Sequence, residues 1–233
     1  MIAFDNFTDG GDNGGTTNSL TYSHVFAANS IGFIGVQGGN IGSEADDISS
    51  VTCGGLSCTL IDKITTDPYG GAGGQVVRYN YLYYIDNPGS GSKSIVITAG
   101  SNHYILSGTV SYTGASNTGI PDNSTKQQSS LYNSASLATS LTTVADNCWT
   151  VLFIESFDGL APGAGSGSTL RGYGNNFGNW ALFDSNGPIS PAGSYSMTTT
   201  QNSGSAAIGI SHIMASFKIP VSMTLILMGD GLT

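Results

Sequence analysis

The stretch GTVSYTGASNTGIPDNST, residues 108–125, contains both patterns from which the fold can be predicted. In its first half, Val110 and Tyr112 alternate with Ser and Thr residues, as in a half-buried β-strand. Its second half is a run of Gly, Ser, Asn, Pro and Asp, the residues that favour turns. That run has no aromatic residue, no histidine and a single acid, Asp122. We therefore expect a core strand followed by an exposed crossing from one sheet to another.

Runs of these two kinds alternate along most of the chain, and helical periodicity is nearly absent. The predicted strands are residues 20–26, 31–37, 48–53, 59–65, 76–85, 94–99, 105–113, 137–144, 149–157, 169–173, 180–183, 195–200 and 206–217. Residues 129–144 are ambiguous, because a stripe of Leu and Ala at helical spacing coincides with many Ser and Thr residues, which disfavour a helix interior. We expect a loop followed by a strand there.

Turn signals at intervals of about eight to twelve residues are typical of sandwiches and barrels. The sequence therefore predicts an all-β fold, an antiparallel two-sheet β-sandwich that is jelly-roll-like. Because no long linker divides the chain, we expect one sandwich domain over residues 1–218. Residues 219–233 are expected to be a C-terminal strand or docking segment that contains Pro220, Leu225 and Leu227.

Composition and charge limit the classes of partner that the protein is expected to bind. The 233 residues carry a net charge of −9, with only six Lys and Arg residues, which are scattered singly. Nucleic acids and membrane surfaces are recognised by clustered basic residues, so neither is expected as a partner. The apolar C-terminal window is too short to span a bilayer, and the N-terminus lacks the basic and apolar regions of a signal peptide.

The chain has three cysteines and three histidines, and neither set forms a catalytic or zinc-binding motif. We expect the cysteines to be small buried hydrophobic side chains. A Cys53–Cys58 disulfide is the alternative, which a two-residue Gly-Gly hairpin turn would prevent. His24, His103 and His212 each stand alone in or beside a predicted strand, so we expect packed or surface side chains rather than a triad.

Glu155 interrupts an apolar strand in WTVLFIESFDG, residues 149–159. A carboxyl group in such a place could act as a general acid in glycoside hydrolysis, which uses a pair of carboxyl groups. A structural or rim position is the alternative, because no partner carboxylate is defined. Taken with the missing motifs, this pattern leads us to expect a protein that is not an enzyme.

Acidic, glycine-rich loops suggest calcium as the metal to consider, since it takes carboxylate and carbonyl oxygens. Asp9, Asp12 and Asn13 lie close together in DNFTDGGDNGG, although their spacing does not match an EF-hand. A solvated turn is the alternative explanation. No other cofactor is expected.

Carbohydrate binding is suggested by the aromatic residues of RGYGNNFGNW, residues 171–180. Tyr173, Phe177 and Trp180 lie in or beside a predicted loop and could form a platform on which a sugar ring stacks. Aromatic residues beside glycines also pack over the backbone of turns, so burial is an equally good interpretation.

The order of several blocks adds a resemblance to this picture. The chain runs through LTYSHVF, IGFIGVQ, VTCGGLSCTLI, YNYLYYIDNPGSGSKSIVIT, GTVSYTGASNTGIPDNS, TTVADNCWTVLF, WALFDSNGPISPAGSYSMTTT and IGISHIMASFKI. This order resembles a poorly characterised group of β-sandwich proteins encoded in phage genomes and environmental bacterial sequences. The resemblance covers most of residues 19–217 and implies that the VSYTGA and ADNCW blocks are core strands. It carries no catalytic signature.

The resemblance implies a structural component of a phage virion, which acts through contacts with itself or with other virion proteins. A capsid decoration protein or a tail- or fibre-associated sandwich would fit, and assembly in the host cytoplasm would agree with the missing signal peptide. The alternative is a carbohydrate-binding module for attachment to a host surface or polysaccharide. If the protein is not viral, an extracellular surface is the expected location.

Overall fold

The computed structural model describes residues 1–41, 46–66, 76–129, 136–156, 162–174, 179–201 and 210–220, and the regular structure in these ranges is all β-strand. The strands are β1 (Ala3–Asp12), β2 (Ser19–Phe26), β3 (Ser30–Ile41), β4 (Ile48–Cys53), β5 (Leu56–Ser57), β6 (Thr59–Thr66), β7 (Val76–Asp86), β8 (Gly91–Ala99), β9 (Tyr104–Thr113), β10 (Asn123–Ser129), β11 (Ser136–Thr142), β12 (Trp149–Ser156), β13 (Pro162–Ala164), β14 (Thr169–Gly174), β15 (Asn179–Asp184), β16 (Ser194–Gln201) and β17 (Ile210–Phe217). Every pairing between them is antiparallel.

Strands β1 to β9 form one jelly roll, called here the N-terminal unit. β1 pairs with β9, β2 with β8, β3 with β7 and β4 with β5, as in a long hairpin that has been rolled up. Pairing of β3 with β9 and of β4 with β8 completes two sheets, the inner N sheet β1-β9-β3-β7-β6 and the outer N sheet β2-β8-β4-β5. The chain passes from the outer to the inner sheet at Cys58, between β5 and β6.

Strands β10 to β17 form a second jelly roll, the C-terminal unit, with the same strand order. The inner C sheet is β10-β17-β12-β15-β14, and the outer C sheet is β11-β16-β13. The strands of the two units correspond in chain order, from β10 as the counterpart of β1 to β17 as the counterpart of β9. With this correspondence both sheets of the N-terminal unit are reproduced, except that β5 has no separate counterpart among the described strands. The protein is therefore a tandem pair of jelly rolls.

Backbone geometry supports this correspondence. The non-glycine residues with positive φ in the described ranges are all asparagines, which tolerate this conformation better than most residues. Asn29 precedes β3 and Asn147 precedes its counterpart β12. Asn87 follows β7 and Asn186 follows its counterpart β15. Equivalent turns in the two units are thus built in the same way.

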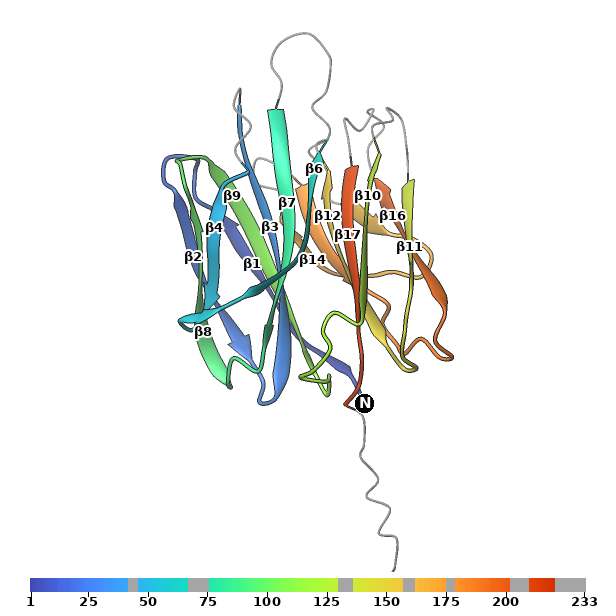
Figure 1. Cartoon of the computed structure of the whole chain (residues 1–233). Helices are drawn as coiled ribbons and strands as arrows, with labels where there is room; N and C mark the ends of the chain where they lie inside the picture. Colours follow the sequence, from blue (N-terminus) through green and yellow to red (C-terminus); the bar gives the residue numbers. More distant parts are fainter. Residues whose placement is uncertain are drawn as a thin grey trace, which may run out of the picture.

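The two inner sheets pack face to face, so that the layers follow in the order outer N, inner N, inner C and outer C from left to right in Figure 1. The core between the inner sheets is rich in aromatic residues. The rings of Phe33 and Phe217 lie 4.9 Å apart, as do those of Tyr112 and Phe217, and Tyr112 meets Trp149 edge-on. Separate cores fill the space between the two sheets of each unit.

The packing of the two units follows an approximate two-fold axis. β6 lies against β10 and β17, and its counterpart β14 lies against β1 and β9. Counted from Asn29 and Asn147, Gly35 and Phe153 are equivalent, and a Cβ added at Gly35 would clash with the Phe153 ring. Contact between equivalent residues is the mark of an isologous interface. The axis therefore passes between β3 and β12.

The all-β, antiparallel, jelly-roll-like sandwich expected from the sequence is confirmed, but residues 1–218 hold two sandwiches with four sheets, instead of one with two. The boundary between the two sandwiches could not be recognised in the sequence, because residues 114–122, which join them, resemble every other run of turn residues. The units also share a core, so no long linker separates them. Those residues join the inner N sheet to the inner C sheet, so the predicted crossing between sheets is confirmed.

Two long strands, β1 and β10, were not expected. Both are edge strands of an inner sheet, where one side of the strand has no partner among the described strands. Their sequences resemble loops, because β10 is polar throughout and β1 combines polar residues with two glycines. The ambiguous residues 129–144 contain the strand β11, as expected, and the preceding residues 130–135 lie outside the described ranges.

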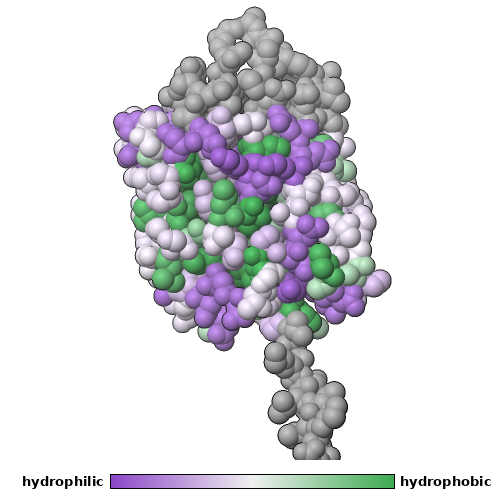
Figure 2. All heavy atoms as spheres, viewed as in Figure 1, coloured by the Kyte–Doolittle hydropathy of each residue, from purple (hydrophilic) through white to green (hydrophobic). Residues whose placement is uncertain are grey.

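The surface seen in Figure 2 mixes hydrophilic and hydrophobic residues, with a hydrophilic band across the upper part of the described surface. Large exposed hydrophobic side chains occur at separate places, among them Val25, Leu56, Leu60 and Val144. Among the described residues there is no helix long and apolar enough to cross a membrane.

Candidate functional site

His24 is buried between the two sheets of the N-terminal unit. Its Nδ1 lies 2.8 Å from Thr8 Oγ1, and its Nε2 lies 3.0 Å from Ser111 Oγ. Ser111 Oγ in turn donates to Asp5 Oδ2 at 2.7 Å. A Ser-His-Asp triad requires the imidazole between serine and carboxylate, whereas here the serine lies between the other two. Burial lowers the pKa of His24 to about 4, so the ring is neutral near pH 7.

His212 is the buried histidine of the C-terminal unit. Its Nδ1 lies 2.7 Å from Thr139 Oγ1 and its Nε2 lies 3.1 Å from Thr199 Oγ1, so both ring nitrogens meet hydroxyl groups. Burial lowers its pKa to about 3. Like His24, this residue satisfies a polar position inside a sandwich. The expectation that these two histidines are packed is confirmed.

The remaining histidine, His103, is buried beside Asp47, with 3.3 Å between Nδ1 and Asp47 Oδ1. This distance fits an ion pair, but the angles do not fit a hydrogen bond, and neither ring nitrogen has a hydrogen-bond partner. The other Asp47 oxygen accepts from Ser101 Oγ at 2.7 Å. No serine, threonine or cysteine side chain in the described ranges is hydrogen-bonded to His103.

The cysteines are free thiols, as expected for the two that are buried, Cys53 and Cys148. Cys53 pairs with Leu56 across a turn formed by two glycines of positive φ, so Cys53 and Cys58 do not face each other. Burial raises the pKa of Cys53 to about 11 and those of Cys58 and Cys148 to about 12. Thiols with such pKa values are weak nucleophiles at neutral pH.

Glu155 lies inside the molecule near the two-fold axis. Its side chain is fully buried, accepts from Gln37 Nε2 at 3.1 Å and lies 3.5 Å from Asn80 Nδ2. Asn80 Nδ2 also bonds to Ser211 Oγ. Counted from Asn29 and Asn147, Gln37 and Glu155 are equivalent residues. The carboxylate is thus part of the contact between the two units, the structural position that the sequence left open.

The predicted sugar platform is not formed as expected. Tyr173, at the end of β14, is 42% exposed. Trp180 is only 1% exposed, because its ring fills the space left by Gly108 and Gly174, where a Cβ would clash with it. Phe177 lies outside the described residues. Trp180 therefore stabilises the core, which is the alternative that the neighbouring glycines had suggested.

The residues proposed for calcium form turns at the end of β1. Asp9 Oδ1 accepts from Gly11 N at 2.8 Å, and Asp12 Oδ1 accepts from Gly14 N at 2.7 Å. Asn13 Oδ1 accepts from two backbone amides, and its Nδ2 donates to the carbonyl of His103 at 2.9 Å. Among the described residues no group of three or more His, Cys, Asp or Glu side chains is arranged for a metal. Calcium binding stays a prediction.

The C-terminal segment begins beside the core. Ile219 packs against the core between the inner sheets, and Pro220 is exposed. Leu225 and Leu227 lie outside the described residues, so the docking role of this segment stays a prediction.

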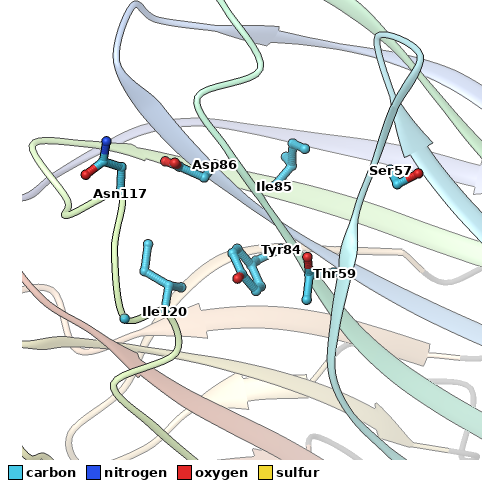
Figure 3. Close-up of a pocket in the computed structure, with 8 residues that line it drawn as sticks. Ser57, Thr59, Tyr84, Ile85, Asp86, Asn117 and Ile120 are labelled. Atoms are coloured by element: carbon cyan, nitrogen blue, oxygen red, sulfur yellow. The ribbon is translucent and has the colours of Figure 1, made fainter.

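A cleft of about 360 Å³ lies where the units are joined. Two connections and one strand end surround it: the β5–β6 connection, the β9–β10 crossing and the end of β7. Figure 3 shows Asp86 beside Asn117, and Tyr84 between Thr59 and Ile120. Its lining residues are Ser57, Thr59, Tyr84, Ile85, Asp86, Asn117, Gly119 and Ile120.

The polar side chains that line this cleft are not hydrogen-bonded to other side chains of the described ranges. Ser57, Thr59, Tyr84, Asp86 and Asn117 form no side-chain hydrogen bond or ion pair with another described residue. Among the acids of the described ranges, Asp86 alone has no such partner. Partial burial raises the pKa of its carboxyl above the usual value. An open cleft with converging free polar groups and an aromatic ring is the general form of a small-molecule site.

Sequence reasoning did not find this site. Ser57, Asp86 and the crossing residues come from CGGLSC, DNPGSGS and GASNTGIPDNST, which are far apart in the chain and each read as an ordinary turn. The other lining residues, Thr59, Tyr84 and Ile85, lie at the ends of the predicted strands 59–65 and 76–85. The β5–β6 connection and the end of β7 meet because the N-terminal unit folds into a jelly roll. The β9–β10 crossing lies beside them because it leads from this unit into the C-terminal unit.

Comparisons with protein-family models, with curated proteins and with solved structures found no match. The geometry of the chain itself is thus the basis for any functional inference.

Proposed function

We propose that the protein is a non-enzymatic structural component of a phage virion, a capsid decoration protein or a tail- or fibre-associated domain that acts through protein–protein contacts. The observation that carries this proposal is the fusion of two jelly rolls through one aromatic core, which gives a single rigid block. Jelly rolls are used in viral capsids and in lectins. Fold alone does not define function, so this part of the support is an analogy.

The chemistry of the described residues agrees with a role that is not catalytic. The imidazoles of His24 and His212 are buried and neutral, and the thiols have raised pKa values. Glu155 is buried in the contact between the units. These side chains stabilise the fold from inside and are not presented to a substrate.

The outer sheets offer surfaces that another protein can approach. Exposed positions on β11 and β16 alternate with buried ones and are occupied only by Ser, Thr and Ala. Their counterparts on β2 and β8 are Ser, Thr and Val. A partner that covers such a face does not have to desolvate charged groups, which is the costly part of burying polar surface.

The direct test is mass spectrometry of density-gradient-purified particles from cells that carry the gene. We expect the chain to sediment with the particles in a fixed ratio to the other particle proteins. Recovery only from the soluble lysate would exclude a virion role.

The same preparation tests the C-terminal segment. Deletion of residues 220–233 should abolish incorporation or oligomerisation and leave both jelly rolls folded, because only Ile219 and earlier residues belong to the described core. Normal incorporation of this truncated chain would exclude docking by the segment.

The second candidate function is carbohydrate binding, for attachment to a host surface or a polysaccharide, and the cleft beside Asp86 is the observation that favours it. A glycan array probed with the intact protein tests this function, with Tyr173→Ala as a variant that addresses the exposed aromatic residue of β14. No binding to any glycan would exclude it.

A further inference from the structure

Each unit has an aspartate at the end of the corresponding strand, and the surroundings of the two aspartates differ. Asp86 is the last residue of β7, and Asp184 is the last residue of its counterpart β15. Asp184 is fully buried, pairs with Arg171 Nε at 2.6 Å and accepts from Tyr112 Oη at 2.9 Å. Asp86 has none of these partners and faces the cleft. The fold thus satisfies one aspartate and leaves the other available.

The neighbours of Asp86 are complementary to a molecule that carries several hydroxyl groups. The carboxylate accepts two hydrogen bonds, and the Asn117 amide both donates and accepts. Ser57, Thr59 and Tyr84 add hydroxyl groups that do either. A sugar ring presents donors and acceptors in this way around its edge, so each free group of the cleft can be satisfied.

The apolar part of the cleft suits the faces of such a ring. The side chains of Tyr84 and Ile120 lie next to each other in Figure 3, on the wall opposite Asp86 and Asn117 in this view. The C–H groups of a pyranose ring pack on an aromatic or aliphatic surface of this kind. The cleft volume of about 360 Å³ is also within the range of small-molecule sites, about 300–1,000 Å³.

Charge limits the class of ligand. Asp86 has no ion-pair partner in the described ranges, and the whole chain carries a net charge of −9. The Lys218 ammonium lies beside Gly119 on the crossing, and it forms no ion pair with Asp86. An acidic sugar would bring a second negative charge to this carboxylate, and like charges repel in a partly desolvated site. Neutral ligands avoid this repulsion.

We propose that the cleft between the β5–β6 connection, the end of β7 and the β9–β10 crossing binds a neutral monosaccharide unit, anchored by Asp86 and Asn117 and packed on Tyr84. This inference rests on carbohydrate binding, the second candidate function proposed above, and it assigns that binding to the joint between the two jelly rolls. Residues 114–122 then serve both as the connection between the units and as one wall of the site.

The test is a titration of the full chain with D-glucose, D-galactose, D-mannose and N-acetylglucosamine, followed by NMR or calorimetry, with glucuronate as the acidic probe. We expect at least one neutral sugar to bind, and Asp86→Ala and Asn117→Ala each to weaken it about tenfold or more, as expected for loss of a hydrogen bond to a charged or well-placed group. Asp146→Ala and Asn102→Ala, which remove an exposed aspartate and asparagine outside the cleft, are the matched controls and should bind normally.

The outcomes separate the site from the function. Sugar binding that persists in both cleft variants would keep the carbohydrate function and overturn the proposed site. No binding of any neutral sugar would overturn both. Tighter binding of glucuronate than of glucose would overturn the assignment of a neutral ligand. Urea unfolding of each variant checks that a loss of binding does not reflect a loss of folding.

Discussion

Gly35 in the N-terminal unit and Phe153 in the C-terminal unit occupy equivalent positions, and one makes room for the other. Two phenylalanines would clash at this place, and two glycines would leave a void next to the two-fold axis. The strand order of a jelly roll is kept with very different side chains, since it depends on the alternating pattern and on turns. Packing across an axis of approximate symmetry instead requires that equivalent residues differ. Gly35 and Phe153 show this difference at the point where the two units touch.

The largest effect is expected from Phe153→Ala. The substitution removes a ring from the core and leaves a cavity facing Gly35, so the free energy of unfolding should fall by about 3–5 kcal/mol in urea titrations. Gly35→Ala should also destabilise the protein, by about 1–3 kcal/mol, because its Cβ clashes with Phe153.

A double variant sharpens this comparison. In the Phe153→Ala background the clash is absent, so Gly35→Ala should cost much less than it does in the natural chain. Equal costs in both backgrounds would show that the two residues do not touch. Val25→Ala, at an exposed position, is the control and should change stability by less than about 0.5 kcal/mol.

The two ionic contacts at the edges of the interface should differ in a similar way. Arg171 on β14 pairs with Asp184, and their side chains are 14% and 0% exposed. Lys126 on β10 pairs with Asp62 at 2.7 Å, and these side chains are 47% and 27% exposed. Arg171→Met leaves a buried carboxylate without its cation and should cost about 3 kcal/mol or more in the free energy of unfolding. Lys126→Met should cost less than about 1 kcal/mol.

Salt provides the check on that pair. The effect of Lys126→Met should shrink further at high ionic strength, and that of Arg171→Met should change little, because buried pairs are screened less. Equal effects of the two substitutions would contradict the assigned burial.

The effect that is smallest at pH 7, and that grows as the pH falls, concerns the two buried histidines. In each, burial lowers the folded-state pKa below 6.5, to about 4 for His24 and about 3 for His212. Below pH 6.5 the unfolded chain takes up a proton that the folded chain does not, so stability falls as the pH falls towards these values. Each histidine should contribute a slope of about 1.4 kcal/mol per pH unit between pH 6 and 4.

The slope of stability against pH should decrease in His24→Asn and in His212→Asn, whatever their stability at pH 7. Below pH 4 the folded chain protonates His24 as well, so of the two only His212 still lowers the free energy of unfolding as the pH falls. In that range His212→Asn should reduce the slope of stability against pH more than His24→Asn does. A curve with the same slope as that of the natural chain would show that the histidine titrates normally when folded.

The fold class could be predicted from the sequence because alternation and turn residues are local signals. Most of the predicted strands are present, and the crossing after Tyr112 joins two sheets as expected. The presence of two jelly rolls could not be predicted, because equivalent positions carry different residues, such as Gly35 and Phe153 or Gln37 and Glu155. The turn asparagines Asn29 and Asn147 are a weak signal of it, since asparagine is common in turns throughout the chain.

The site was harder to predict for a related reason. Trp180 follows the polar and glycine residues of RGYGNNFGN, and the sequence left a sugar platform and a buried position open for it. The structure buries it, because glycines on β9 and β14 make a space that its ring fills. Asp86 and Asn117 looked like ordinary turn residues, and their chemistry depends on having no partner in the folded chain. A free polar group is recognised only when all of its neighbours are known.

Differential scanning calorimetry of the full chain measures whether the two jelly rolls, which share one core, unfold as a single block. We expect one endothermic transition, with a van't Hoff enthalpy equal to the calorimetric enthalpy, because neither unit keeps its inner sheet covered when the other unfolds. Two resolved transitions, or a van't Hoff enthalpy close to half of the calorimetric value, would show that the units fold independently and would contradict this expectation.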